Sequence, residues 1–119
     1  MAKIIRNGTV VTAADTFKAD IRIEGETIHS VSKNIEAQPG DEIIDAAGKY
    51  VFPGGIDVHT HLELPFMGTV SADDFETGTK AAIMGGPTTI IDFTIPEKGK
   101  PLPDALDAWH DKATGRVAT

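Results

Sequence analysis

The spacing of apolar residues changes near Tyr50, and this change limits the folds open to the chain. Before Tyr50, residues 20–24 and 27–31 alternate polar and apolar side chains, as half-buried β-strands do. A further short strand is predicted at residues 42–45. Short strands in succession predict a small β-structure that needs a second layer to bury its apolar face.

The dipeptide Asn7-Gly8 predicts a turn inside this β-rich part. It separates two apolar runs, residues 3–6 and 9–12. Asn-Gly is favoured in two-residue hairpin turns because both turn positions need a positive φ. The sequence therefore predicts that these two runs pair with each other as a hairpin.

After Tyr50 the pattern alternates between strands and helices. Two nearly continuous apolar strands are predicted to be buried on both faces. The first helix is expected to be capped by Ser71 and to stop at Gly85-Gly86. The second is expected to be opened by Pro103 and to end at Gly115. The predicted elements are a strand at 52–58, a helix from 71, a strand at 88–93, a helix with an apolar stripe of Leu102, Leu106, Trp109 and Ala113, and a third strand at 116–118.

Two strand–helix units cannot close a barrel, since a barrel of eight units takes about 250 residues. The expected fold is therefore α/β with a β-rich N-terminal part, divided into residues 1–51 and 52–119. Its parallel sheet would end with an open edge. We expect the chain to be the N-terminal part of a longer protein.

Composition excludes several classes of function. The formal net charge is -7, so the chain lacks the basic surplus that a nucleic-acid partner requires. Cysteine is absent, which rules out disulfides and thiolate metal sites and agrees with a cytoplasmic location. No secretory signal and no run of 18 apolar residues is visible, so no membrane partner is expected.

The strongest chemical motif is His59-Thr60-His61, at the end of the first strand after Tyr50. Side chains two apart on a strand point the same way, so His59 and His61 share a face with Asp57. Neutral imidazole nitrogens are common ligands of zinc, and active sites of parallel barrels lie at the carboxyl ends of the strands. We predict that both histidines bind a metal. The alternative is a pair of histidines satisfied by hydrogen bonds.

The residues around the motif have less certain roles, and two interpretations of each stay open. Asp57 either supports a metal-bound imidazole through a hydrogen bond or is a buried, paired acid. Leu64 and Phe66 either line a substrate pocket or simply pack. Glu63 is expected to be solvated or in a salt bridge. Asp92, at the end of the second strand, either supports the site or makes loop hydrogen bonds.

The run at residues 53–66, Pro-Gly-Gly-Ile-Asp-Val-His-Thr-His-Leu-Glu-Leu-Pro-Phe, resembles metal-dependent cyclic amidohydrolases. The runs at 4–12, 68–82 and 101–110 narrow the resemblance to the hydantoinase and dihydropyrimidinase branch. The resemblance implies that residues 1–51 belong to a β-sandwich and residues 52–119 to the first units of a catalytic (β/α)8 barrel. It also implies two divalent metals, usually zinc, with His59 and His61 on the more buried one.

The implied reaction is hydrolytic opening of hydantoins or dihydropyrimidines to N-carbamoyl amino acids. A metal lowers the pKa of bound water and polarises the carbonyl. In the family the remaining ligands and the catalytic aspartate lie later in the chain, so no catalytic residue is assigned here. The enzyme is expected to be a homo-oligomer, either a dimer or a tetramer. We expect the 119-residue chain alone to be inactive, because two imidazoles are too few for a catalytic zinc site.

Two alternatives remain. One is an allantoinase or dihydroorotase. The latter typically carries Arg shortly after His-x-His to hold a substrate carboxylate, whereas Leu62-Glu63-Leu64 stands here. The other is a non-catalytic relative used for assembly, which would be expected to lose metal ligands that this chain keeps.

Overall fold

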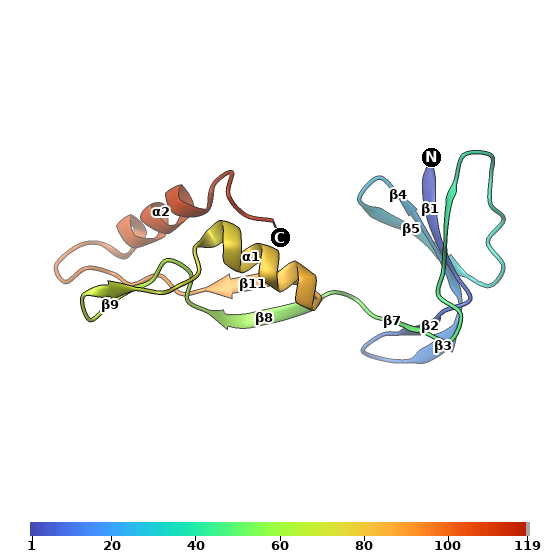
Figure 1. Ribbon diagram of the computed structural model, residues 1–119, viewed down its shortest axis with the longest axis horizontal. Helices are drawn as coiled ribbons and strands as arrows, with labels where there is room; N and C mark the ends of the chain where they lie inside the picture. The colour runs from blue at the N-terminus through green and yellow to red at the C-terminus, as the bar shows by residue number, and fades with distance from the viewer. Residues whose placement is uncertain (119) are drawn as a thin grey trace. The chain divides into compact units, whose positions relative to one another are not determined.

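The computed structural model describes residues 1–118, and the chain divides into two compact units, Met1–Pro53 and the part from Gly54 onward (Figure 1). In the described residues the first unit is built from strands, and both helices lie in the second. The chain is therefore α/β with a β-rich N-terminal part. The strands of the first unit are β1 (Ala2–Arg6), β2 (Thr9–Val11), β3 (Thr16–Lys18), β4 (Asp20–Glu24), β5 (Thr27–Ser32), β6 (Glu42–Asp45) and β7 (Tyr50–Val51). The second unit contains β8 (Gly55–Thr60), β9 (Pro65–Phe66), β10 (Thr69–Val70), α1 (Phe75–Gly85), β11 (Pro87–Asp92) and α2 (Leu102–Ala113).

The first unit contains two sheets, with strand orders β5-β4-β1-β6 and β3-β2-β7. The predicted strands at β4, β5 and β6 are confirmed, and Gly25 turns β4 into β5 with a φ of 60°. Strands of both sheets contribute to one core, so the predicted second layer is the other sheet. Its buried residues are Val10, Ala19 and Ile21, with Ile5, Ile23 and Val51 packed against them.

The predicted Asn7-Gly8 hairpin is wrong, because β1 and β2 belong to different sheets. Asn7 does adopt a positive φ of 62°, but its backbone N–H donates to Asp20 and its side-chain amide donates to Asp45. At Gly8 a Cβ would lie 2.7 Å from Val51 Cγ2. Glycine therefore allows close packing between strands at this position, and the local turn signal is overridden by long-range pairing.

The second unit is built around a parallel pair, β8 and β11, connected through α1 (Figure 1). Leu62, Phe75 and Trp109 form its buried cluster, and Ile90 of β11 packs against them. The prediction that both strands are buried on both faces is wrong for the described residues. Outside this cluster the apolar side chains of the strands are exposed: Ile56 by 64%, Val58 by 63% and Ile91 by 51%.

The start of α1 differs from the prediction. Asp74, not Ser71, caps the helix: the Asp74 carboxylate accepts the Thr77 backbone N–H, and Thr77 Oγ1 accepts the Asp74 backbone N–H. Ser71 instead pairs with Leu64, accepting its N–H at 2.8 Å. A carboxylate three residues before a hydroxyl completes a reciprocal cap, which outweighs an isolated serine upstream. The stop at Gly86, with a φ of 105°, is confirmed.

The apolar stripe predicted on α2 is only partly buried. Trp109 is buried and Ala113 packs against it, whereas Leu106 and Leu102 are 51% and 71% exposed. The helix does begin with proline in its first turn and ends before Gly115, as predicted. The predicted third strand at residues 116–118 is wrong: the Arg116 N–H closes a turn on Ala113, and the Ala118 N–H donates to Thr79 Oγ1.

Four short strands of residues 1–118 escaped the sequence analysis: β3, β7, and the two-residue pair β9 and β10. The sequence at β3 has no periodicity long enough to read, and β9 begins with a proline. Over residues 1–118, neither helix is long and apolar enough to cross a membrane.

Candidate metal centre

His59 and His61 lie at the carboxyl end of β8, one within the strand and one just beyond it. Their Nε2 atoms are 3.1 Å apart and their rings meet edge to face, with centroids 4.9 Å apart. Both side chains are exposed. The structure therefore brings the two predicted residues together on one side of the chain and leaves them accessible from solvent.

The geometry of this pair fits a divalent metal. Zinc–nitrogen distances of about 2.0–2.1 Å and a tetrahedral angle put two ligand nitrogens about 3.3–3.4 Å apart. The observed 3.1 Å is within a few tenths of an ångström of that spacing, and it is also a hydrogen-bond distance between the two rings, so both interpretations of the pair stay open. Within residues 1–118, no group of three or more His, Asp or Glu side chains lies close enough together to hold a metal ion. The pair therefore offers two donors to a site that needs more.

Phe93 packs against both imidazoles and was missed by the sequence analysis. Its ring centroid lies 4.6 Å from that of His59 and 5.4 Å from that of His61. Phe93 immediately follows β11, which pairs in parallel with β8 and brings Asp92 opposite Thr60. The signal that could have found Phe93 is this parallel register, since it places the two strand ends side by side.

Asp57 is exposed in this chain, and both interpretations of its role stay predictions. Its Oδ1 accepts the backbone N–H of His59 at 3.1 Å. The carboxylate thus holds the main chain at the first histidine.

The loop after the histidines separates the two residues predicted to line a pocket. Leu64 is half-buried and packs against the cluster of Leu62, Phe75 and Trp109. Phe66, in the β9–β10 hairpin, is 58% exposed. Leu64 therefore takes part in internal packing, and only Phe66 presents its ring to solvent.

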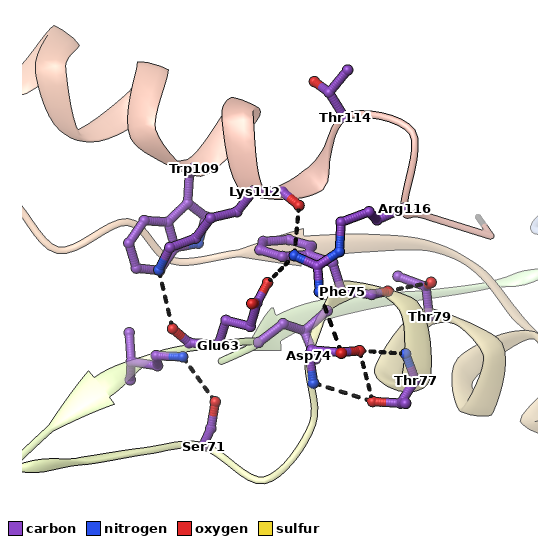
Figure 2. A network of polar contacts seen from close by, with 12 residues as sticks. Glu63, Ser71, Asp74, Phe75, Thr77, Thr79, Trp109, Lys112, Thr114 and Arg116 are labelled. Carbon is purple, nitrogen blue, oxygen red and sulfur yellow. Dashed lines mark hydrogen bonds and ion pairs between the residues drawn. The ribbon is translucent and has the colours of Figure 1, made fainter.

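An ionic network binds Glu63, which lies in the same loop between the histidines and α1 (Figure 2). Arg116 donates to the Glu63 carboxylate at 2.9 Å and lies 3.3 Å from the Asp74 carboxylate. Lys112 donates to the backbone carbonyl of Glu63. The predicted salt bridge of Glu63 is thus confirmed.

Asp74 links this network to α1. The Thr77 backbone N–H, followed by the Thr77 hydroxyl and the charge of Arg116, lowers the pKa of Asp74. These contacts favour the ionised carboxylate, which both caps α1 and faces Arg116.

Comparison with known proteins identifies the family of the chain. The amidohydrolase family profile matches residues 50–116. The chain is 56% identical to a D-hydantoinase of Geobacillus stearothermophilus over 98% of this chain and 25% of that one. It is 52% identical to a dihydropyrimidinase of Dictyostelium discoideum, over 96% of this chain and 23% of that one. The crystal structure of a dihydropyrimidinase from Brevibacillus agri superposes with a TM-score of 0.93 at 53% identity, over 98% of this chain and 25% of that one.

A parallel strand pair with a helix after each strand, and with two histidines at the carboxyl end of β8, is an α/β architecture. The chain belongs to the amidohydrolase family. This family depends in general on divalent metals. The chain spans about a quarter of the length of the curated relatives it matches.

Proposed function

We propose that this chain is the N-terminal part of a metal-dependent hydrolase that opens hydantoins or dihydropyrimidines to N-carbamoyl amino acids. The observation that carries the proposal is the paired Nε2 atoms of His59 and His61, 3.1 Å apart at a strand end. The proposed reaction and substrate class are taken from relatives named D-hydantoinase and dihydropyrimidinase.

In this proposal residues 1–51 are the N-terminal part of a β-sandwich, and residues 52–119 are the first units of a (β/α)8 barrel. The succession of β8, α1, β11 and α2, with the two strands parallel, supports the assignment. In such barrels the active site lies at the carboxyl ends of the strands. His59 and His61 stand at that end of β8.

His59 and His61 are proposed to hold one of two zinc ions through Nε2. When bound, zinc lowers the pKa of a water molecule and polarises a substrate carbonyl. The chain's own residues orient the ligands: Phe93 packs against both rings, and Asp57 holds the backbone at His59.

Leu64 and Phe66 are proposed to form part of the substrate pocket. The exposed ring of Phe66 suits an apolar ring substituent, while Leu64, packed against the cluster, would support the pocket wall from behind. The general acid–base group is proposed to lie outside this chain. A cytoplasmic location and assembly as a dimer or tetramer remain predictions, and sedimentation of the complete enzyme tests the second.

The test is metal content and hydrolysis in the complete enzyme. His59→Ala and His61→Ala should each lower the zinc content by about one ion per subunit and abolish hydantoin opening, since two adjacent ligands share that ion. His29→Ala is the matched control because His29 is an exposed histidine in β5, and it should change neither quantity. Unaltered zinc content in both site variants would refute the ligand assignment.

The substrate is tested separately by offering the wild-type enzyme hydantoin, dihydrouracil, allantoin and dihydroorotate. Turnover of the first two supports the proposal. Turnover of only the last two would favour the allantoinase or dihydroorotase alternative, and turnover of none would favour a non-catalytic relative. The isolated 119-residue chain should be inactive on all four.

A further inference from the structure

Asp92, the last residue of β11, gathers four hydrogen-bond donors around one carboxylate. Oδ1 accepts from Thr60 Oγ1 at 3.2 Å and from the Phe93 N–H at 2.9 Å. Oδ2 accepts from Trp109 Nε1 at 3.1 Å, and the Leu62 N–H points at both oxygens, 3.2 and 3.3 Å away. These donors come from the end of β8 (Thr60), the turn after it (Leu62), the residue after β11 (Phe93) and α2 (Trp109).

We propose that Asp92 is a positioning residue for His61. Its carboxylate fixes the main chain at the residue that directly follows this histidine. The inference rests on the proposed function of His59 and His61 as metal ligands. It assigns Asp92 no contact with metal or substrate.

The main chain needs such support at this point. β8 ends at Thr60, and its pairing with β11 shifts register between Asp57 and Thr60 and ends before His61, so the strand ladder does not reach His61. Two residues further on, Glu63 adopts a φ of 47°, in the left-handed region that a residue with a side chain avoids. The turn that aims His61 is thus costly for the backbone and depends on surrounding contacts.

Contacts on three sides fix this turn. Asp92 accepts the Leu62 N–H, the Leu62 side chain is buried against Phe75 and Trp109, and Arg116 and Lys112 bind Glu63. Among these, the bond to the Leu62 N–H acts on the residue next to His61. Because a carboxylate binds N–H donors more strongly than a neutral acceptor does, it is the contact best suited to set the position of the ring.

If Asp92 had only a structural role, a different result would be expected for a variant of Trp109. Through Trp109, Asp92 also connects β11 to α2. If this link were the whole function, Trp109→Phe, which removes the indole donor, would reproduce every effect of Asp92→Ala. If Asp92 positions His61, Trp109→Phe should leave the Leu62 N–H protected and the metal site nearly intact.

The test uses the complete enzyme and three readouts: zinc affinity by chelator competition, the visible spectrum of the cobalt-substituted enzyme, and amide exchange at Leu62 in the metal-free enzyme. Asp92→Ala should weaken zinc binding about 10- to 100-fold, the usual effect of losing a residue that orients a ligand. It should also alter the cobalt spectrum and speed Leu62 exchange about 10-fold or more. Asp107→Ala, at an exposed aspartate of α2, is the matched control and should change none of these.

Asp92→Asn decides the matter if Asp92→Ala fails to fold. Asparagine keeps one acceptor oxygen and turns an amide donor toward the donors at the other, so zinc binding should weaken about threefold or more. Wild-type zinc affinity in Asp92→Asn, or equal losses in Trp109→Phe and Asp92→Ala, would overturn the inference. Failure of the wild-type enzyme to bind zinc or open hydantoin would instead refute the proposed function.

Discussion

Gly78 in α1 faces the side chain of Leu62, the residue after His61. Replacing Gly78 by alanine tests how closely α1 packs against Leu62. A Cβ at Gly78 would lie 2.3 Å from Leu62 Cδ2 and 3.4 Å from Asp73 Cβ. Overpacking of this kind costs about 1–3 kcal/mol, whereas Gly→Ala in a helix gains about 1 kcal/mol. Gly78→Ala should therefore destabilise the chain by about 0–2 kcal/mol.

The sign should reverse when Leu62 is shortened. Leu62→Ala alone should cost about 2–3 kcal/mol, near the low end for buried leucines because the cluster is small. In that background the new Cβ meets no Leu62 methyl group, so Gly78→Ala should stabilise by about 1 kcal/mol. The difference between the two backgrounds, about 1–3 kcal/mol, measures the contact.

Urea unfolding of the 119-residue chain, followed by tryptophan fluorescence, is the assay. Trp109 is the one tryptophan in the sequence and lies in the same cluster as Leu62. Gly85→Ala is the matched control in α1, because its Cβ would only touch Pro87 at an ordinary 3.6 Å. Equal effects of Gly78→Ala in the two backgrounds, within about 0.5 kcal/mol, would refute the reasoning.

Three further predictions concern stability. The Gln38 N–H, with the Ala2 N–H and Arg22, lowers the pKa of Asp41 to about 2. Because the folded pKa of Asp41 is below the unfolded value of about 3.9, the stabilisation by its carboxylate is complete above that pH and is lost as pH falls toward 2. In Asp41→Asn the free energy of unfolding should therefore fall less steeply over this acid range. Asp74→Ala should cost about 1 kcal/mol in urea unfolding through loss of the α1 cap, with Asp107→Ala as an unaffected control. Thr79→Val, which removes the acceptor for the Ala118 N–H, should cost about 1 kcal/mol, and a change below about 0.3 kcal/mol would show that this bond is not formed.

Local patterns predicted the elements well where a strand-forming run lies between turn signals or where a helix has its own stop signal. The strands β4, β5 and β6 and the glycine stop of α1 follow from periodicity and backbone preference. Local patterns gave wrong pairings where residues distant in the chain bind the hydrogen-bonding groups of a predicted turn. Asn7-Gly8 has a hairpin sequence, yet Asp20 and Asp45 bind Asn7 and the flanking strands pair elsewhere.

The candidate site divides in the same way. The two-residue spacing predicted that His59 and His61 share one side, and the structure brings their rings together although His61 lies just beyond the strand. Phe93 beside the rings and the four donors on Asp92 required the parallel register of β8 and β11, which joins residues about thirty positions apart.

The sequence by itself determined which two histidines are proposed as ligands, because backbone geometry fixes side-chain direction over two or three residues. Only the tertiary structure decided what surrounds them: the aromatic ring against the imidazoles, the carboxylate behind Leu62, and the charges that hold Glu63. Those neighbours are set by strand register and helix packing, which depend on burial across the whole unit and leave no local trace in the chain.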